Sequence, residues 1–145
     1  MDPEKFALLS KDVRVMIDAL KGQVVIAGGL GKGKPEATKN SIWFNGQDLH
    51  DEGHETFHIE PNFKSSYPQQ NDDGKFFAFC KTARKPYDIL VVATLCAARY
   101  RFGDEIVISS DGDRKDWQEG YDLWVKTCNP VDPDYEVILE GIDVS

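Results

Sequence analysis

The chain has 145 residues and a net charge of −8, and 41% of its residues are hydrophobic. This length and apolar content predict one globular domain with a hydrophobic core and exclude a disordered chain. The negative charge opposes non-specific binding to nucleic acid or to an anionic membrane, because a phosphate-rich surface would repel the protein.

The first half of the sequence predicts one helix followed by short strands. Apolar residues repeat with the helical period from Pro3 to Leu20, Asp2 is the expected N-cap, and Gly22 ends the helix. We expect a long loop over 62–74, after strands at 23–27, 41–45 and 56–59.

The second half predicts a strand over 75–80, an apolar helix over 87–100 and a strand over 105–109. A further helix carries Trp117, Tyr121, Trp124 and Cys128 on one face, and 135–139 reads as a terminal strand. The expected fold is α+β: an antiparallel-rich sheet packs against the central apolar helix, with two further helices. We expect one domain over 1–130 and an acidic C-terminal extension over 131–145.

The three cysteines and the flanking sequences indicate the compartment. Cys80, Cys96 and Cys128 are widely spaced in apolar stretches and form no CxxC pair, so we expect reduced thiols in a cytoplasmic protein. A basic N-terminal segment followed by an apolar run is missing, as is any run of 18 apolar residues. We therefore expect neither a signal peptide nor a membrane span.

The most informative segment is a cationic turn between a strand and the apolar helix. Residues 81–101 carry five cations and one acid, a net charge of +4 in a chain of −8. Free backbone N–H groups and the helix dipole favour anions at such a helix start. We therefore predict an anion or phosphate site, with aromatic rings that could stack on a base, at Lys81, Thr82, Arg84, Lys85, Tyr87 and Phe79. The alternative is that these cations pair with the surplus of Asp and Glu.

An HExxH pattern raises the possibility of a zinc protease, with ligands at His54 and His58 and a general base at Glu55. All three histidines lie within residues 50–58, which favours a metal site. The context opposes it: Gly53 and Pro61 leave room for barely two helical turns, and the residues between them favour a strand. We expect no metal and no other cofactor, and keep a zinc-dependent hydrolase as an alternative.

A second near-match lies in the glycine- and lysine-rich residues 28–34, which fit the GxxxxGK pattern of a P-loop. Pro35 occupies the position where Ser or Thr would bind Mg²⁺, and proline disfavours helix at Lys34. We expect a loop with solubilising lysines and not an NTPase, and we expect Lys32 to contribute less to ligand binding than Arg84.

The residues 77–88, together with Gly103-Asp104, Ser109-Ser110-Asp111-Gly112 and Trp117, resemble a group of small bacteriophage proteins with no established activity. The resemblance covers about residues 76 to 128. It implies a phage accessory protein made in the bacterial cytoplasm. By analogy with other phage accessory proteins, it could counter host defence by binding a defence protein or by sequestering a nucleotide.

These observations favour a non-enzymatic binding protein that holds a phosphate-bearing small molecule or nucleotide at the cationic turn. The alternative from a different class is a protein–protein inhibitor or assembly factor that uses its acidic surface, with a host defence protein as partner. The sequence leaves the ligand and the oligomeric state open.

Overall fold

The computed structural model describes residues 2–47, 53, 56–61, 76–78, 85–110, 114–140 and 142–144. Its helices are α1 (Pro3–Leu20), α2 (Asp88–Phe102), α3 (Arg114–Cys128) and α4 (Tyr135–Glu140). Its strands are β1 (Ile26–Ala27), β2 (Glu36–Ala37), β3 (Ile42–Gly46), β4 (Phe57–Ile59), β5 (Phe76–Ala78), β6 (Ile106–Ser110) and β7 (Ile142–Val144). Short 3-10 helices occur at Gly29–Gly31 and Gly103–Glu105.

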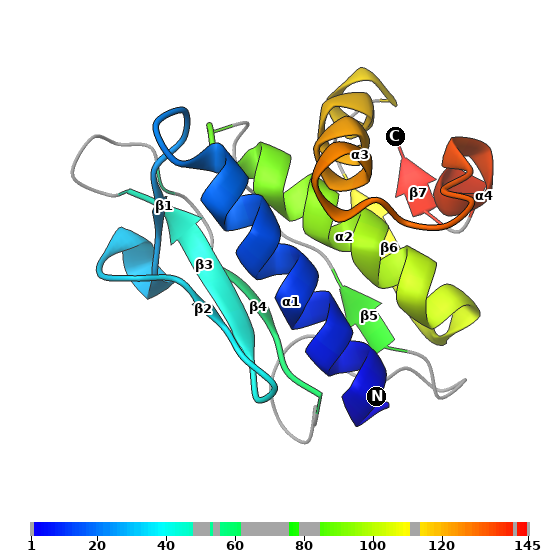
Figure 1. The fold of residues 1–145 in the computed structure, drawn as a ribbon, viewed down its shortest axis with the longest axis horizontal. Helices are drawn as coiled ribbons and strands as arrows, with labels where there is room; N and C mark the ends of the chain where they lie inside the picture. The colour runs from blue at the N-terminus through cyan, green and yellow to red at the C-terminus, as the bar shows by residue number, and fades with distance from the viewer. Residues whose placement is uncertain are drawn as a thin grey trace.

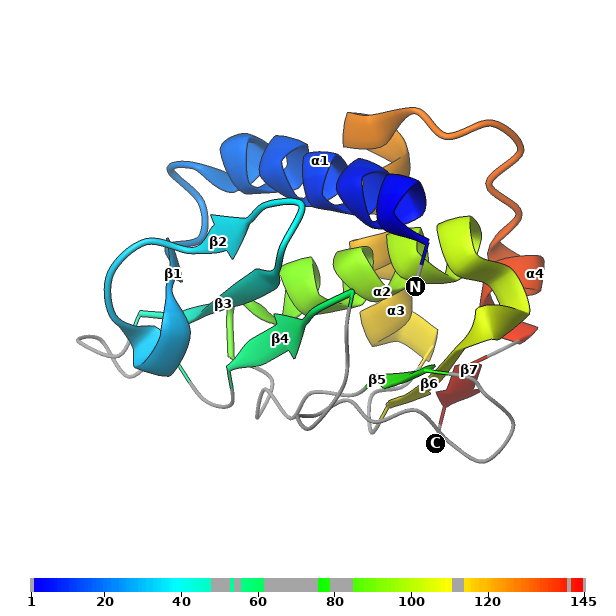
Figure 2. The same ribbon diagram turned by 90° about the horizontal axis from the view of Figure 1, so that it is seen from below.

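The fold is α+β, with helices packed on two small sheets. In the first sheet, β3 pairs antiparallel with β1, β2 and β4. In the second sheet, β6 pairs parallel with β5 and β7. Figure 1 shows the first sheet on one side of α1, with α2 and α3 on the other side. Figure 2 shows α2 between α1 and the second sheet, and α2 contacts α1, α3 and β6.

Helix α1 has the predicted bounds, because both ends are set locally. The Asp2 carboxylate accepts hydrogen bonds from the backbone N–H of Glu4 at 2.9 Å and of Lys5 at 3.5 Å, satisfying donors of the first turn. The chain leaves the helix at Gly22, whose φ of 84° favours glycine. One face is buried, and it comprises Phe6, Leu9, Ser10, Asp12, Val13, Met16 and Leu20.

The prediction that α2 is a central, buried helix is confirmed. Ten of its fifteen residues are buried, and Val91 and Leu95 are only 2% and 3% exposed. Such burial follows from a sequence without a polar face, because exposure would leave a large apolar patch. The helix ends where Gly103 takes a φ of 56°.

The C-terminal residues differ from the expectation. The strand predicted over 135–139 is wrong, because this stretch forms α4, and a strand follows it at β7. The Asp134 carboxylate accepts hydrogen bonds from the backbone N–H of Glu136 at 3.0 Å and of Val137 at 3.3 Å, and so caps the helix. Ile138 is buried in the core, and β7 pairs with β6. Helix α4 and strand β7 thus contact the rest of the described chain through Ile138 and through the pairing of β7 with β6.

The arrangement of the strands also differs. We expected 75–80 and 105–109 to join an antiparallel-rich sheet, but β5 and β6 form a parallel pair in a separate sheet. The strand–helix–strand order through α2 explains this, because two strands of one sheet that are joined by a crossover helix run parallel. Three helices accompany α2 within the described residues, where we expected two. None of the described helices is both long and apolar enough to cross a membrane.

Candidate functional site

The predicted anion site at the start of α2 lies mostly outside the described residues: Lys81, Thr82, Arg84 and Phe79 are not among them. Lys85 is half-buried, and Tyr87 is fully buried in the hydrophobic core. The Tyr87 ring therefore has no exposed face on which a base could stack. Tyr87 therefore packs in the core.

The backbone at the start of α2 has fewer free donors than the sequence suggested. The N–H of Asp88 donates to the Lys85 carbonyl at 2.9 Å, and those of Leu90 and Val91 donate to the Tyr87 carbonyl at 3.0 and 3.3 Å. Asp88 also places a carboxylate in the first turn. Both features reduce the attraction that this helix start offers to an anion.

The HExxH pattern does not form a metalloprotease helix at its second histidine. His58 lies in strand β4, opposite Trp43, and its Nε2 is 2.9 Å from Glu60 Oε1. A strand does not align side chains at positions i and i+4 on a helical face, which HExxH chemistry requires. His54 and Glu55 lie outside the described residues, and no group of three possible metal ligands occurs among the described ones.

The glycine- and lysine-rich segment, here called the Gly/Lys loop (residues 28–35), interrupts the edge of the first sheet. Ala27 of β1 pairs with Asn45, and Glu36 of β2 pairs with Trp43. Asn45 and Trp43 are separated by one residue of β3, so an uninterrupted partner strand would have one residue between Ala27 and Glu36. The chain has eight residues there. The chain thus leaves the sheet, forms the Gly/Lys loop and returns in β2. Since a strand follows Lys34, the loop lacks the helix of a P-loop.

The Gly/Lys loop has a defined backbone. The Gly28 N–H donates to the Gly33 carbonyl at 3.0 Å, which closes the loop at its base. The Leu30 N–H donates to Thr56 Oγ1 at 3.0 Å and ties the tip to the segment before β4. A Cβ at Gly28 would lie 2.5 Å from the Lys34 carbonyl oxygen, so only glycine fits there. Leu30 has a φ of 59° and is 81% exposed.

Two clefts flank the Gly/Lys loop. The first cleft has a volume of about 520 Å³ and is lined by the loop at Gly31, Lys32 and Gly33, by β1 and by Gln47. None of the described residues that line it carries a carboxylate. Lys32 therefore gives this cleft a positive charge, and the amide of Gln47 adds hydrogen-bonding groups.

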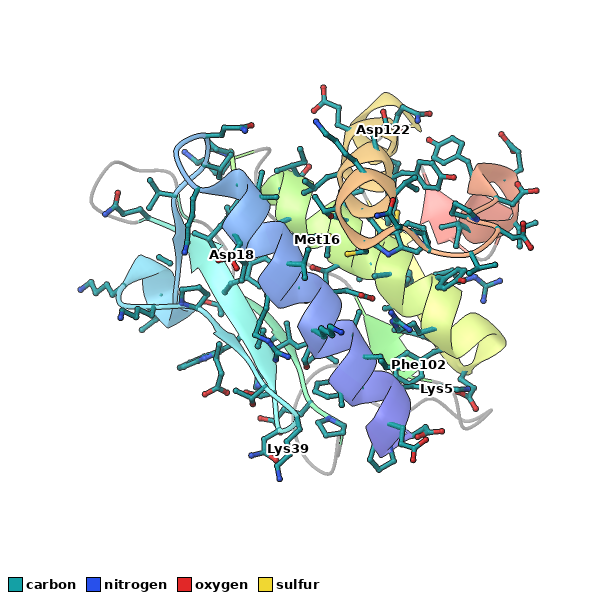
Figure 3. The ribbon with its side chains drawn as sticks, viewed as in Figure 1. Lys5, Met16, Asp18, Lys39, Phe102 and Asp122 are labelled. Atoms are coloured by element: carbon teal, nitrogen blue, oxygen red, sulfur yellow. The ribbon has the colours of Figure 1, made fainter. Side chains whose placement is uncertain are left out.

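The second cleft, here called the Trp43 cleft, has a volume of about 490 Å³ and lies between α1 and β2. Its charged residues are Arg14 and Asp18 from α1, Lys34 from the Gly/Lys loop and Glu36 from β2. Figure 3 shows Asp18 on the side of α1 that faces the first sheet. The apolar residues of its lining are Ile17, Pro35, Ala37 and Trp43.

Trp43 is fixed in place although it is partly exposed. Its neighbours on β3, Ile42 and Phe44, point into the core, so alternation along the strand turns Trp43 to the outer face, where it is 39% exposed. A Cβ at Gly29 would lie 2.7 Å from Trp43 Cζ3, so the loop backbone packs directly against the ring. The His58 ring lies 6.3 Å away, centroid to centroid, on the neighbouring strand. Two separate elements thus hold the ring at the cleft.

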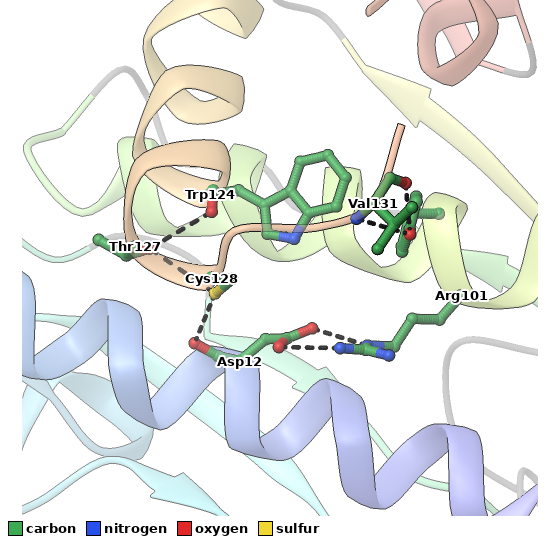
Figure 4. Close-up of polar contacts among 7 residues, drawn as sticks. Asp12, Arg101, Trp124, Thr127, Cys128 and Val131 are labelled. Atoms are coloured by element: carbon green, nitrogen blue, oxygen red, sulfur yellow. Dashed lines mark hydrogen bonds and ion pairs between the residues drawn. The ribbon is translucent and has the colours of Figure 1, made fainter. Parts of the chain in front are cut away.

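A buried polar network joins the three long helices (Figure 4). The Arg101 guanidinium donates to both carboxylate oxygens of Asp12, from Nε at 2.7 Å and from Nη2 at 3.0 Å. Cys128 Sγ donates to the Asp12 carbonyl at 3.7 Å. Burial raises the pKa of the Cys128 thiol, which keeps it protonated and poorly nucleophilic. This network stabilises helix packing and offers no reactive group.

The predicted reduced cysteines agree with Cys96 and Cys128, which are free thiols, while Cys80 lies outside the described residues. Comparison of the chain with protein-family models, curated proteins and solved structures found no match. The functional argument therefore rests on the geometry of this chain.

Proposed function

We propose that the protein is a non-enzymatic binding protein that holds a phosphate-bearing small molecule of the nucleotide class. The observation that carries the proposal is the Gly/Lys loop: its backbone is fixed by hydrogen bonds, and it places Lys32 and Lys34 in two adjacent clefts. Concave sites with a few placed polar groups are the usual form of small-molecule sites, and both cleft volumes fall in the range of about 300–1,000 Å³ that such sites occupy.

The proposal does not include catalysis. Among the described residues, neither cleft is lined by a histidine or a cysteine, and the two described cysteines are buried or half-buried away from them. Nucleophilic catalysis needs an activated side chain within reach of a base, which these linings do not supply. Lysines beside an ordered glycine-rich backbone suit the binding of a phosphate instead.

The biological setting belongs to the same proposal. The resemblance of residues 77–88 and the motifs that follow to phage proteins supports an accessory protein that acts in the host cytoplasm. A stoichiometric binder of a nucleotide signal would act there by lowering its free concentration. This role needs tight binding and no turnover.

Thermal-shift measurements with mono-, di- and cyclic nucleotides and with divalent metals test the proposal. A ligand at a hundredfold excess over its Kd stabilises a protein by about 2.7 kcal/mol, which is a readily measured shift. Four single variants then locate the phosphate: Lys32→Ala in the first cleft, Lys34→Ala in the Trp43 cleft, Arg84→Ala in the cationic turn, and Lys39→Ala as a control. Lys39 is an exposed lysine that lines neither cleft (Figure 3).

We expect a nucleotide to raise the melting temperature and one of the three test variants to weaken its binding, with the control unchanged. A charge-assisted hydrogen bond contributes about 1.5–3 kcal/mol, so the loss of affinity at the correct position is roughly tenfold or more. The proposal is wrong if no nucleotide or phosphate shifts the melting temperature. Stoichiometric zinc that is lost in His58→Ala would instead favour the hydrolase.

A protein–protein inhibitor is the second candidate, and one surface favours it. Val131 and Val137, at 75% and 57% exposure, lie among the acidic residues Asp132, Asp134 and Glu136. Apolar side chains within an acidic surface suit a partner with a basic rim. A binding partner that is lost with Val137→Asp, in a protein that no nucleotide stabilises, would favour this reading.

A further inference from the structure

We infer that the Trp43 cleft is the nucleotide site itself, and that it takes a guanine-type base on Trp43 with the phosphate at Lys34 and Arg14. The inference rests on the proposed function. It adds the position of the ligand and the chemistry of its base.

The ring of Trp43 supplies the stacking surface. It is the one tryptophan with substantial exposure, at 39%, whereas Trp117 and Trp124 are 0% and 1% exposed. Its contacts with Gly29 and its place opposite His58 fix the ring before any ligand arrives. A rigid aromatic side chain that lines a cleft is suited to stack on a base, because little conformational entropy is lost on binding.

Two cations of the cleft suit a phosphate. Arg14 Nη1 donates to the Ala37 carbonyl at 2.7 Å, which anchors the guanidinium at the cleft and leaves its other N–H groups for a ligand. Lys34 is exposed and has no ion-pair partner within the described part of the chain. The two come from different elements, α1 and the Gly/Lys loop, so they meet only in the folded protein.

Two carboxylates distinguish this cleft from the first one and select the base. Asp18 forms an exposed ion pair with Lys21, with 3.0 Å between Oδ1 and Nζ. Glu36 accepts a hydrogen bond from the Ser41 hydroxyl at Oε2. Each carboxylate oxygen has two lone pairs, so both oxygens of either carboxylate can still accept a hydrogen bond from a ligand. Guanine presents two adjacent N–H donors, which one carboxylate can accept together, whereas adenine presents an amino group beside an acceptor.

The opposite charges also explain why free phosphate is a poor occupant. Arg14 and Lys34 sum to +2, and Asp18 and Glu36 sum to −2, so the lining as a whole has no net charge for a small anion. A ligand that carries an anion at one end and N–H donors at the other satisfies both sets of groups. The ring stacked on Trp43 sets the distance between these two ends.

Titration of the protein with GMP, AMP, guanosine and inorganic phosphate, followed by tryptophan fluorescence and calorimetry, tests the inference. Because Trp117 and Trp124 are buried, Trp43 is the tryptophan that a soluble quencher reaches. We expect bound GMP to protect this fluorescence from quenching by acrylamide. We also expect GMP to bind at least tenfold more tightly than AMP, and its affinity to exceed that of inorganic phosphate by a larger factor.

Four variants assign the roles. Trp43→Ala and Lys34→Ala should each weaken GMP binding about tenfold or more, a change that corresponds to about 1.4 kcal/mol. Trp43→Phe should retain most of the affinity because it keeps a stacking ring. Asp18→Asn should reduce the preference for GMP over AMP while leaving AMP affinity nearly unchanged. Lys39→Ala is the control, and circular dichroism of each variant checks the fold.

The outcomes separate this inference from the proposed function. If GMP binds and Arg84→Ala weakens it but Trp43→Ala does not, the inference is wrong and the cationic turn is the site. Equal affinity for GMP, AMP and inorganic phosphate would overturn the assignment of the base alone. Absence of binding by all four probes overturns this inference, and it overturns the proposed function as well if the thermal-shift screen with mono-, di- and cyclic nucleotides is also negative.

Discussion

Gly120 lies in the middle of α3 where this helix meets α2, and it provides a sharp test of the packing. Alanine is normally favoured over glycine within a helix by about 1 kcal/mol. At this position, however, a Cβ would lie 2.4 Å from Val92 Cγ1, 2.6 Å from Val92 Cβ and 2.9 Å from the Ala93 backbone nitrogen. The glycine is therefore required by the close approach of the two helices.

The size of the effect follows from these distances. Non-bonded carbon atoms are at their optimum about 3.5–4.0 Å apart, so Gly120→Ala must separate the helices by roughly 1 Å. Overpacking of this kind costs about 1–3 kcal/mol. The upper end applies here, because a Cβ and a backbone nitrogen cannot rotate away. After subtraction of the gain in helix propensity, we expect a net loss of about 2 kcal/mol in the free energy of unfolding.

Urea denaturation followed by circular dichroism measures this loss. Glu119→Ala, an exposed neighbour on the same helix, is the matched control and should change stability by less than about 0.5 kcal/mol. In a Val92→Ala background the cost of Gly120→Ala should fall, because the closest atom, Val92 Cγ1, is gone. A Gly120→Ala protein that is more stable by about 1 kcal/mol would refute the close-packing argument.

Three further changes test the core. Asp12→Ala should cost about 3 kcal/mol, because it leaves Arg101 partly buried without its carboxylate, and Asp12→Ala with Arg101→Met should recover part of the loss in urea unfolding. Leu95→Ala, at a position 3% exposed, should cost about 2–5 kcal/mol by the same assay. Burial raises the pKa of Cys96 above its ordinary value of 9.0. The folded state thus retains a proton that the unfolded state loses, so the contribution of Cys96 to stability should be constant below pH 9 and fall above it. Cys96→Ala should show a smaller fall than the unmodified protein, because the raised pKa of Cys128 acts in the same direction.

The sequence predicted the elements whose signals are local. Helix α1 could be bounded to the residue, because its N-cap, its apolar period and its terminal glycine agree. The burial of α2 followed from its composition alone. In contrast, 135–139 is rich in the aromatic and β-branched residues that favour strands, yet the Asp134 cap and the burial of Ile138 make it a helix. Tertiary packing overrides such a short pattern.

The parallel pairing of β5 and β6 had a signal that our sequence interpretation did not use. A strand, a helix and a strand follow one another over 76–110, and this order favours a parallel pair through a crossover. The antiparallel expectation came from the overall order of elements and not from this unit. The extra pairing with β7 was not predictable locally, because β7 is only three residues long.

The candidate site could be predicted only in part. Alternation at 41–45 placed Trp43 on a strand, and the glycines and lysines at 28–34 marked a loop, but nothing local connects them. Their meeting depends on the register that puts Glu36 opposite Trp43 and on the packing of Gly29 against the ring. Arg14 and Asp18 are one helical turn apart on α1, and this spacing predicts that they share one face of the helix. Only the fold shows that this face lines a cleft together with β2 and Trp43.

The net charge of −8 should oppose the binding of a nucleic acid more strongly than the binding of a mononucleotide. Exposed charges separated by more than about 8 Å are largely screened at physiological ionic strength. A mononucleotide in the Trp43 cleft is small enough to interact mainly with Arg14, Lys34 and the two nearby carboxylates. A nucleic acid would extend over the acidic surface as well, and each additional phosphate would meet repulsion. A net charge that opposes the binding of a polymer is therefore compatible with the binding of a single nucleotide, because the nucleotide interacts mainly with cations and acceptors placed locally in this cleft.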